Sequence, residues 1–145
     1  MIIKSFEVNP FSQNSYLVHQ ENANSAILFD VGFYSDSDWA QFDSYFDQHK
    51  LVLKGIFLTH AHLDHSGNVP SLFVSGNTDV YATPPTFDLS KLLINDMLKI
   101  EKNSHPFDLP ELNNMMKNAK EIGFKEEVTK GNATFEFRES GHVIG

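Results

Sequence analysis

The chain has 145 residues, which is the length of one domain with a hydrophobic core of its own. With 41% hydrophobic and 21% charged residues its composition excludes an intrinsically disordered protein, and the lack of cysteine excludes disulfides and thiolate metal ligands. The formal net charge is −8 and the pI is about 5.2, without the basic footprint of a nucleic-acid-binding protein. This charge argues against nucleic acid as a partner of the chain acting alone.

No apolar run reaches the roughly 18 residues that a membrane-spanning helix needs. The first ten residues, MIIKSFEVNP, lack the long apolar core of a signal peptide. We therefore expect a cytoplasmic protein that does not associate with membranes.

The first elements along the chain are three expected strands, over residues 2–8, 14–20 and 25–32. The third strand is continuously apolar, which indicates burial on both faces. A helix is expected next, over residues 36–49, because Ser35 and Asp36 are good N-caps. Its buried stripe should consist of three aromatic residues: Trp39, Phe42 and Phe46.

Strands are expected over residues 51–58 and 79–83, followed by a helix over residues 83–102 with a proline in its first turn. We expect the apolar face of this helix to be Leu89, Leu92, Leu93, Met97 and Ile100.

A second helix is expected over residues 108–123, and a final hairpin over residues 124–140 with its turn at Gly131-Asn132. Strands followed by alternating strands and helices favour a single α/β domain over residues 1–145, with helices packed on a mixed sheet.

The stretch LTHAHLDHSGN places His60, His62, Asp64 and His65 within six residues, directly after an expected strand. Alternate side chains of extended chain point the same way, so His60 and His62 can face one ion. A turn after them can bring Asp64 and His65 opposite, giving two half-sites for a pair of metals that activates water for hydrolysis. The alternative is a loop of solvated histidines with no metal.

This stretch matches the His-x-His-x-Asp-His signature of the metallo-β-lactamase superfamily. The resemblance implies that His60 and His62 bind a first metal. It implies that Asp64 and His65 bind a second metal, with Asp64 also orienting the nucleophilic water as a catalytic residue.

Two more stretches resemble the family. LFDVG resembles its strand that ends in Asp-x-Gly, which implies that Asp30 supports the metal loop from behind the ligands and that Gly32 permits a tight turn. ESGHVIG resembles its Gly-His loop, which implies that His142 completes the first metal site. The other histidines, His19, His49 and His105, are not expected to be ligands.

Different parts of the chain resemble different branches of the family. The segment up to Gly32 resembles glyoxalase-II-like hydrolases, which cleave thioesters. The segment from Thr59 onward, with TPPTFDL and GHVIG, resembles the beta-CASP RNA-processing nucleases. This difference suggests a chimera, natural or engineered, with a junction between Gly32 and Thr59.

The resemblance also implies truncation. The family fold is an αββα sandwich that continues past the Gly-His loop to supply a bridging Asp and a last His for the second site. We therefore expect the first half of this sandwich, a mixed sheet with helices on one face. We expect one or two zinc ions, with iron or manganese as alternatives.

Three functions remain open from the sequence. The first is a metal-dependent phosphodiesterase or nuclease, and the second is a thioester hydrolase acting on a small molecule. The third is an inactive metal-binding fragment, because the second site is incomplete. The other sheet face should be an open apolar surface, built from strands that include residues 133–137, and we expect a homodimer to cover it.

Overall fold

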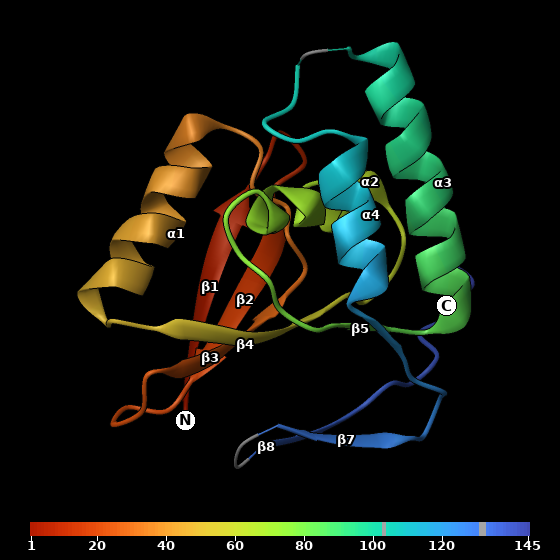
Figure 1. The fold of residues 1–145 in the computed structure, drawn as a ribbon. Helices are drawn as coiled ribbons and strands as arrows, with labels where there is room; N and C mark the ends of the chain where they lie inside the picture. Colours follow the sequence, from red (N-terminus) through yellow and green to blue (C-terminus); the bar gives the residue numbers. More distant parts are fainter. Residues whose placement is uncertain (103, 131–132) are drawn as a thin grey trace.

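The structure is a computed structural model that describes residues 1–102, 104–130 and 133–145. A six-stranded sheet in the order β1-β2-β3-β4-β5-β6 forms its centre, and β7 and β8 form a separate two-stranded sheet (Figure 1). The elements are β1 (Ile2–Val8), β2 (Gln13–His19), β3 (Ser25–Phe29), α1 (Asp36–Gln48), β4 (Val52–Phe57), α2 (Leu63–Ser66), the 3₁₀ helix η1 (Val69–Phe73), β5 (Val80–Ala82), α3 (Pro84–Ile100), α4 (Leu109–Lys117), β6 (Ala119–Glu121), β7 (Glu127–Lys130) and β8 (Ala133–Glu136).

The central sheet is mixed, as the sequence predicted. Strands β1, β2 and β3 pair antiparallel, whereas β3, β4, β5 and β6 pair parallel. Parallel strands all end at the same edge of the sheet, so the segments that follow β3, β4 and β5 meet there. This edge is where an open α/β sheet places its ligands.

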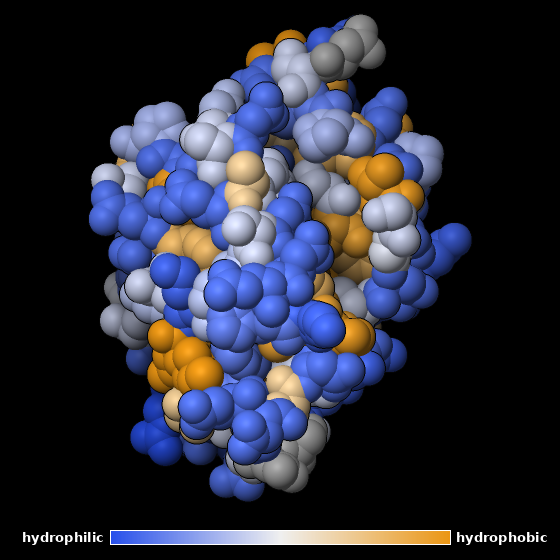
Figure 2. Space-filling model, turned by 90° about the vertical axis from the view of Figure 1, so that its left-hand side faces the viewer, coloured by the Kyte–Doolittle hydropathy of each residue, from blue (hydrophilic) through white to orange (hydrophobic). Residues whose placement is uncertain are grey.

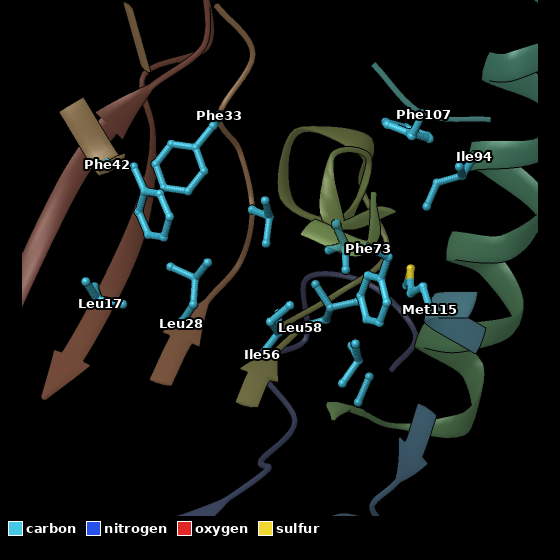
Figure 3. Packing of buried hydrophobic residues seen from close by; sticks show 14 of the residues in the cluster. Leu17, Leu28, Phe33, Phe42, Ile56, Leu58, Phe73, Ile94, Phe107 and Met115 are labelled. Atoms are coloured by element: carbon cyan, nitrogen blue, oxygen red, sulfur yellow. The ribbon is translucent and has the colours of Figure 1, made fainter. Parts of the chain in front are cut away.

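The main core lies between the sheet and the helices, which all pack on one face (Figure 1). Sheet residues such as Leu28 and Ile56 point toward the helices and are fully buried (Figure 3). On the side of α1, Phe33 and Phe42 pack with ring centroids 4.8 Å apart. Aromatic pairs at this distance contribute beyond the area they bury.

Helix α1 begins where the sequence predicted. Ser35 is its N-cap, and the capping box with Asp38 is complete. The expected aromatic stripe packs on the core, with Phe42 buried and Trp39 and Phe46 partly buried. The left-hand side of Figure 1, on which α1 lies, is mainly hydrophilic with separate hydrophobic patches (Figure 2).

The second face of the sheet is not an open apolar surface over β3, β4 and β5. The residues Ile27, Phe57 and Tyr81 are 6%, 1% and 5% exposed, because the β7–β8 hairpin packs over them. Phe135 lies 4.8 Å from Phe57 between ring centroids, and Lys130 donates a 3.1 Å hydrogen bond to Asp79. The expectation that residues 133–137 extend the central sheet is therefore wrong, since these residues cover it.

The second expected helix ends early. Helix α4 stops at Lys117, and Ala119–Glu121 is strand β6 rather than helix. Val80 pairs with Ala119 in a parallel ladder along β5. This long-range pairing overrides local helix propensity, which is a weak preference.

The buried face of α3 agrees with the expected one only in part. Of the expected residues, Met97 packs against the core, whereas Leu89, Leu92 and Ile100 are 38%, 56% and 80% exposed. Phe87 and Ile94 are buried in their place. Both sets lie at helical spacing, so periodicity by itself could not choose between them. Contact with the sheet and α4 selects the second set.

The expected Gly131-Asn132 turn falls outside the described residues, while the strands on either side pair antiparallel as predicted.

Among the described helices, none is long and apolar enough to cross a membrane.

Candidate metal centre

The candidate site lies at the edge where the parallel strands end. Asp30 follows β3 directly, and the histidine loop follows β4 after Leu58 and Thr59. The backbone N–H of Asp30 donates to the carbonyl of Phe57, which joins the two segments. The sequence therefore places a carboxylate and a run of imidazoles on neighbouring strand ends.

Three imidazoles come together at this edge. Among the described residues, His60, His62 and His142 form a group whose potential ligand atoms all lie within 4.8 Å of one another. Nε2 of His60 is 3.1 Å from Nδ1 of His62, and the ring of His142 is 5.0 Å and 5.1 Å from the rings of His60 and His62. Two nitrogens bound to one tetrahedral zinc at 2.0–2.1 Å are about 3.4 Å apart, so the geometry suits an ion after small movements.

The environment of His60 also suits a metal. The residue is 8% exposed, and burial lowers its pKa to about 4, with the neighbouring His65 adding to the shift. His60 is therefore neutral at pH 7, and a metal binds only the neutral imidazole. His62 and His142 are exposed, which leaves one side of the group open to solvent.

Asp64 and His65 lie in α2, beside the three histidines. The ring of His65 is 4.0 Å from the ring of His60, and its Nε2 is 3.6 Å from Oδ2 of Asp64. Burial acts to lower the pKa of His65, but its hydrogen bond to Asp30 and the charges of Asp30 and Asp64 raise it above its usual value. This pair does not join the group of three in the described structure, so its assignment to a second metal stays a prediction.

Asp30 holds the histidine loop from behind. It is 4% exposed and has a φ of 57°, an unusual backbone conformation for a residue other than glycine. Its carboxylate accepts hydrogen bonds from the Thr59 N–H at 2.8 Å, the Thr59 hydroxyl at 2.7 Å and Nδ1 of His65 at 2.8 Å. Asp30 therefore contacts both ends of the histidine loop, and its supporting role at a metal site stays a prediction.

Gly32 lies where the histidine loop (residues 60–65) approaches the hairpin formed by β1 and β2. A Cβ at this position would overlap the Gln13 side chain and lie 2.6 Å from the carbonyl oxygen of Asp64. The side chain of Asn9 donates to the carbonyls of Gly32 and Asp64, at 3.1 Å and 3.4 Å. Glycine is therefore required by the close approach of Gln13 and Asp64 rather than by the tight turn that the sequence suggested, and Asn9 is a contact that the sequence did not predict.

Thr59 was also missed from the sequence. It connects Asp30 to His60, because its hydroxyl is 2.7 Å from the Asp30 carboxylate and 2.9 Å from Nδ1 of His60. The available signal was a hydroxyl residue directly before the first histidine of the cluster.

The remaining histidines lie outside the group of three. His19 is within hydrogen-bond distance of the Tyr45 hydroxyl at 2.9 Å, and His49 packs on the ring of Tyr45. His105 is 3.1 Å from a carboxylate oxygen of Glu101. That none of the three is a metal ligand stays a prediction.

Comparison with known families gives a match to the Metallo-beta-lactamase superfamily over residues 8–113. The chain is 30% identical over 126 residues to RNase aCSPSF2 of Saccharolobus solfataricus, covering 86% of this chain and 25% of that protein. It is 31% identical over 121 residues to Ribonuclease TTHA0252 of Thermus thermophilus, covering 82% and 28%. The chain thus spans about a quarter of the length of these relatives.

A shorter stretch of 55 residues is 47% identical to the transcription termination factor FttA of Pyrococcus abyssi, covering 37% of this chain and 8% of that protein. The 126-residue match to RNase aCSPSF2 runs across residues 32–59, where the sequence suggested a junction. The junction itself stays a prediction.

Solved structures show the same fold. BLEG-1 B3 metallo-beta-lactamase superposes with a TM-score of 0.59 at 22% identity, covering 93% of this chain and 59% of the other. ETHE1 from Myxococcus xanthus superposes with a TM-score of 0.58 at 18% identity, covering 94% and 47%. These matches confirm the predicted fold class, a mixed sheet with helices, and the chain covers about half of each of these two structures. A protein solved in a di-iron-bound form, TTHA1623, has a TM-score of 0.57 at 20% identity, with coverage of 88% and 57%.

Proposed function

Because this chain belongs to the metallo-beta-lactamase superfamily, we propose that it is a divalent-metal-dependent hydrolase that cleaves phosphodiester bonds, in the manner of a nuclease. The observation that carries the proposal is the group of three imidazoles at the strand ends. The names of two sequence relatives, an RNase and a ribonuclease, favour phosphodiesters over other ester-like bonds.

His60, His62 and His142 would hold the ion, and three nitrogen ligands with an open side favour zinc over iron or manganese. A divalent ion in such a site polarises a phosphoryl oxygen and lowers the pKa of water. The buried His60 anchors the group, while the exposed His62 and His142 leave room for the substrate.

Asp64 is the residue we assign to orienting the attacking water. Its side chain is 29% exposed, and it is carried by α2 beside the three histidines. A carboxylate in this place can accept a hydrogen bond from the attacking water, and this bond turns a lone pair of the water oxygen toward the substrate. Oδ2 of Asp64 lies 3.6 Å from Nε2 of His65, whose ring packs against that of His60.

Charge sets an expectation for the kinetics. A chain with a net charge of −8 repels a polyanion, so we expect a high KM for RNA and slow turnover by this chain. Small phosphodiesters with a single charge should be affected less by this repulsion.

The test is hydrolysis by the zinc-loaded chain of bis(p-nitrophenyl) phosphate, of a labelled single-stranded RNA and of a glutathione thioester. We expect slow cleavage of both phosphodiesters, lost in His60→Ala and in Asp64→Ala. His49→Ala is the matched control, because His49 is an exposed histidine outside the group of three, and it should keep the activity.

Two outcomes would contradict the proposal. Cleavage of the thioester without cleavage of either phosphodiester would favour the thioester hydrolase that the first segment of the sequence resembles. Phosphodiester cleavage that survives His60→Ala would show that the group of three histidines does not carry it.

A further inference from the structure

Thr59 is the last residue before the histidine loop, and its side chain makes two short polar contacts. The hydroxyl oxygen lies 2.7 Å from Oδ2 of Asp30 and 2.9 Å from Nδ1 of His60. The backbone N–H of Thr59 donates to the other oxygen of Asp30 at 2.8 Å. Thr59 thus makes one backbone and one side-chain hydrogen bond to the Asp30 carboxylate, and together they fix the direction in which its hydroxyl points.

The protons in this chain of contacts can be assigned by counting donors. An ionised carboxylate only accepts hydrogen bonds, so the single hydroxyl proton of Thr59 is donated to Asp30. The hydroxyl oxygen can then only accept from His60, which requires a proton on Nδ1 of that ring. In a neutral imidazole a proton on Nδ1 leaves the lone pair on Nε2.

The geometry of His60 agrees with this assignment. Nε2 is the atom that faces the other histidines, at 3.1 Å from Nδ1 of His62. Metal-binding histidines ordinarily donate their other ring N–H to a neighbouring acceptor, which fixes the tautomer and the ring orientation. We infer that Thr59 is a positioning residue. Its hydroxyl donates to Asp30 and accepts from Nδ1 of His60, and this leaves Nε2 of His60 as the metal-binding atom.

Asp30 thereby controls a histidine from each predicted half-site. It accepts directly from Nδ1 of His65 at 2.8 Å and reaches His60 through Thr59. In both rings Nδ1 is turned toward the carboxylate and Nε2 away from it. A single buried carboxylate can thus orient both rings.

Thr59 is a practical residue to change, because it is exposed. Thr59→Val removes the hydroxyl and keeps the shape, and the backbone bond to Asp30 is retained. Thr59→Ser is the matched control, since it keeps the hydroxyl and loses a methyl group. If Thr59 only stabilised the loop, Thr59→Val would lower the melting temperature without changing the His60 ring.

The first readout is the tautomer of His60 in the metal-free chain, measured from ¹⁵N shifts of its ring nitrogens and assigned with His60→Gln. We expect Nδ1 protonated and Nε2 unprotonated in the wild type and in Thr59→Ser, and a mixture of tautomers in Thr59→Val. A wild-type His60 protonated on Nε2 would overturn the inference whether or not any variant folds.

The second readout is zinc affinity, measured by competition with a chromogenic chelator. Loss of a partner behind a metal ligand typically weakens binding about 10–100-fold, and we expect a loss in this range for Thr59→Val with Thr59→Ser close to the wild type. Equal affinity in all three proteins would refute the positioning role. The inference rests on His60 being a metal ligand, as in the proposed function, but neither readout uses hydrolysis, so the two can fail separately.

Discussion

Replacing Asp30 with asparagine would keep the size of the side chain and remove its ability to accept several hydrogen bonds. Asparagine also tolerates the positive φ of 57° at this position better than most residues. The amide oxygen can still accept from the N–H of Thr59, but the amide nitrogen replaces the oxygen that accepts from the Thr59 hydroxyl and from His65. Two hydrogen bonds to a charged group are therefore lost.

The magnitude follows from these two bonds. Hydrogen bonds to charged groups contribute about 1.5–3 kcal/mol each, which gives an upper value of about 3–6 kcal/mol for the pair. Thr59 is exposed, so water can replace part of its bond, and His65 is partly exposed, with 22% of its side chain accessible. We therefore expect Asp30→Asn to lower the free energy of unfolding by about 2–3 kcal/mol.

Urea unfolding of the metal-free chain, followed by circular dichroism, measures this difference. Asp88→Asn is the matched control, because Asp88 is an exposed aspartate on α3, and its stability should stay close to that of the wild type. A loss below about 0.5 kcal/mol in Asp30→Asn, the usual range of surface substitutions, would show that the carboxylate does not hold the histidine loop.

Three further predictions concern the metal, pH and assembly. Purified protein should hold about one zinc ion per chain, and His60→Ala or His142→Ala should each lower the metal content measured by elemental analysis; unchanged content in both would refute the ligand assignment. Burial acts to raise the pKa of Asp38, but three backbone N–H donors lower it overall, so its stabilisation should be complete above about pH 4 and disappear as pH falls through its depressed pKa. Urea unfolding of Asp38→Asn should therefore show a stability deficit at pH 7 that shrinks at pH 3, and a deficit independent of pH would contradict this account. We also propose a homodimer that packs through the sheet face left uncovered by the β7–β8 hairpin, where Ile3 and Tyr16 are 58% and 42% exposed; light scattering at micromolar concentration should give twice the chain mass and Tyr16→Arg should reduce it, whereas a wild-type monomer would refute the proposal.

Much of the site could be predicted from the sequence because its determinants are local. His60 and His62 follow a strand at alternate positions, and this spacing is enough to place both imidazoles on one side of the chain. The capping box of α1 is likewise local, since Ser35 and Asp38 are three residues apart. Resemblance to a known signature added His142, which no local pattern connects to the other two histidines.

Other features depended on contacts between distant segments. Residues 119–121 follow a helix and could have continued it, but they form β6 because an unpaired edge of β5 lies beside them. Helix α3 carries two apolar stripes at helical spacing, and the surface of the sheet decided which stripe is buried. Periodicity describes one element at a time, so it contains no information about the partner surface.

The sequence by itself determined the order of most elements, the mixed sheet and the identity of the candidate ligands. Only the tertiary structure decided that the hairpin carrying Phe135 covers the second face of the sheet. It also decided that Thr59 connects Asp30 to His60. A hydrogen bond between Asp30 and Thr59, 29 positions apart, depends on a distance of ångström precision. The parallel pairing of β3 with β4 sets this distance, and the spacing of residues along the chain does not.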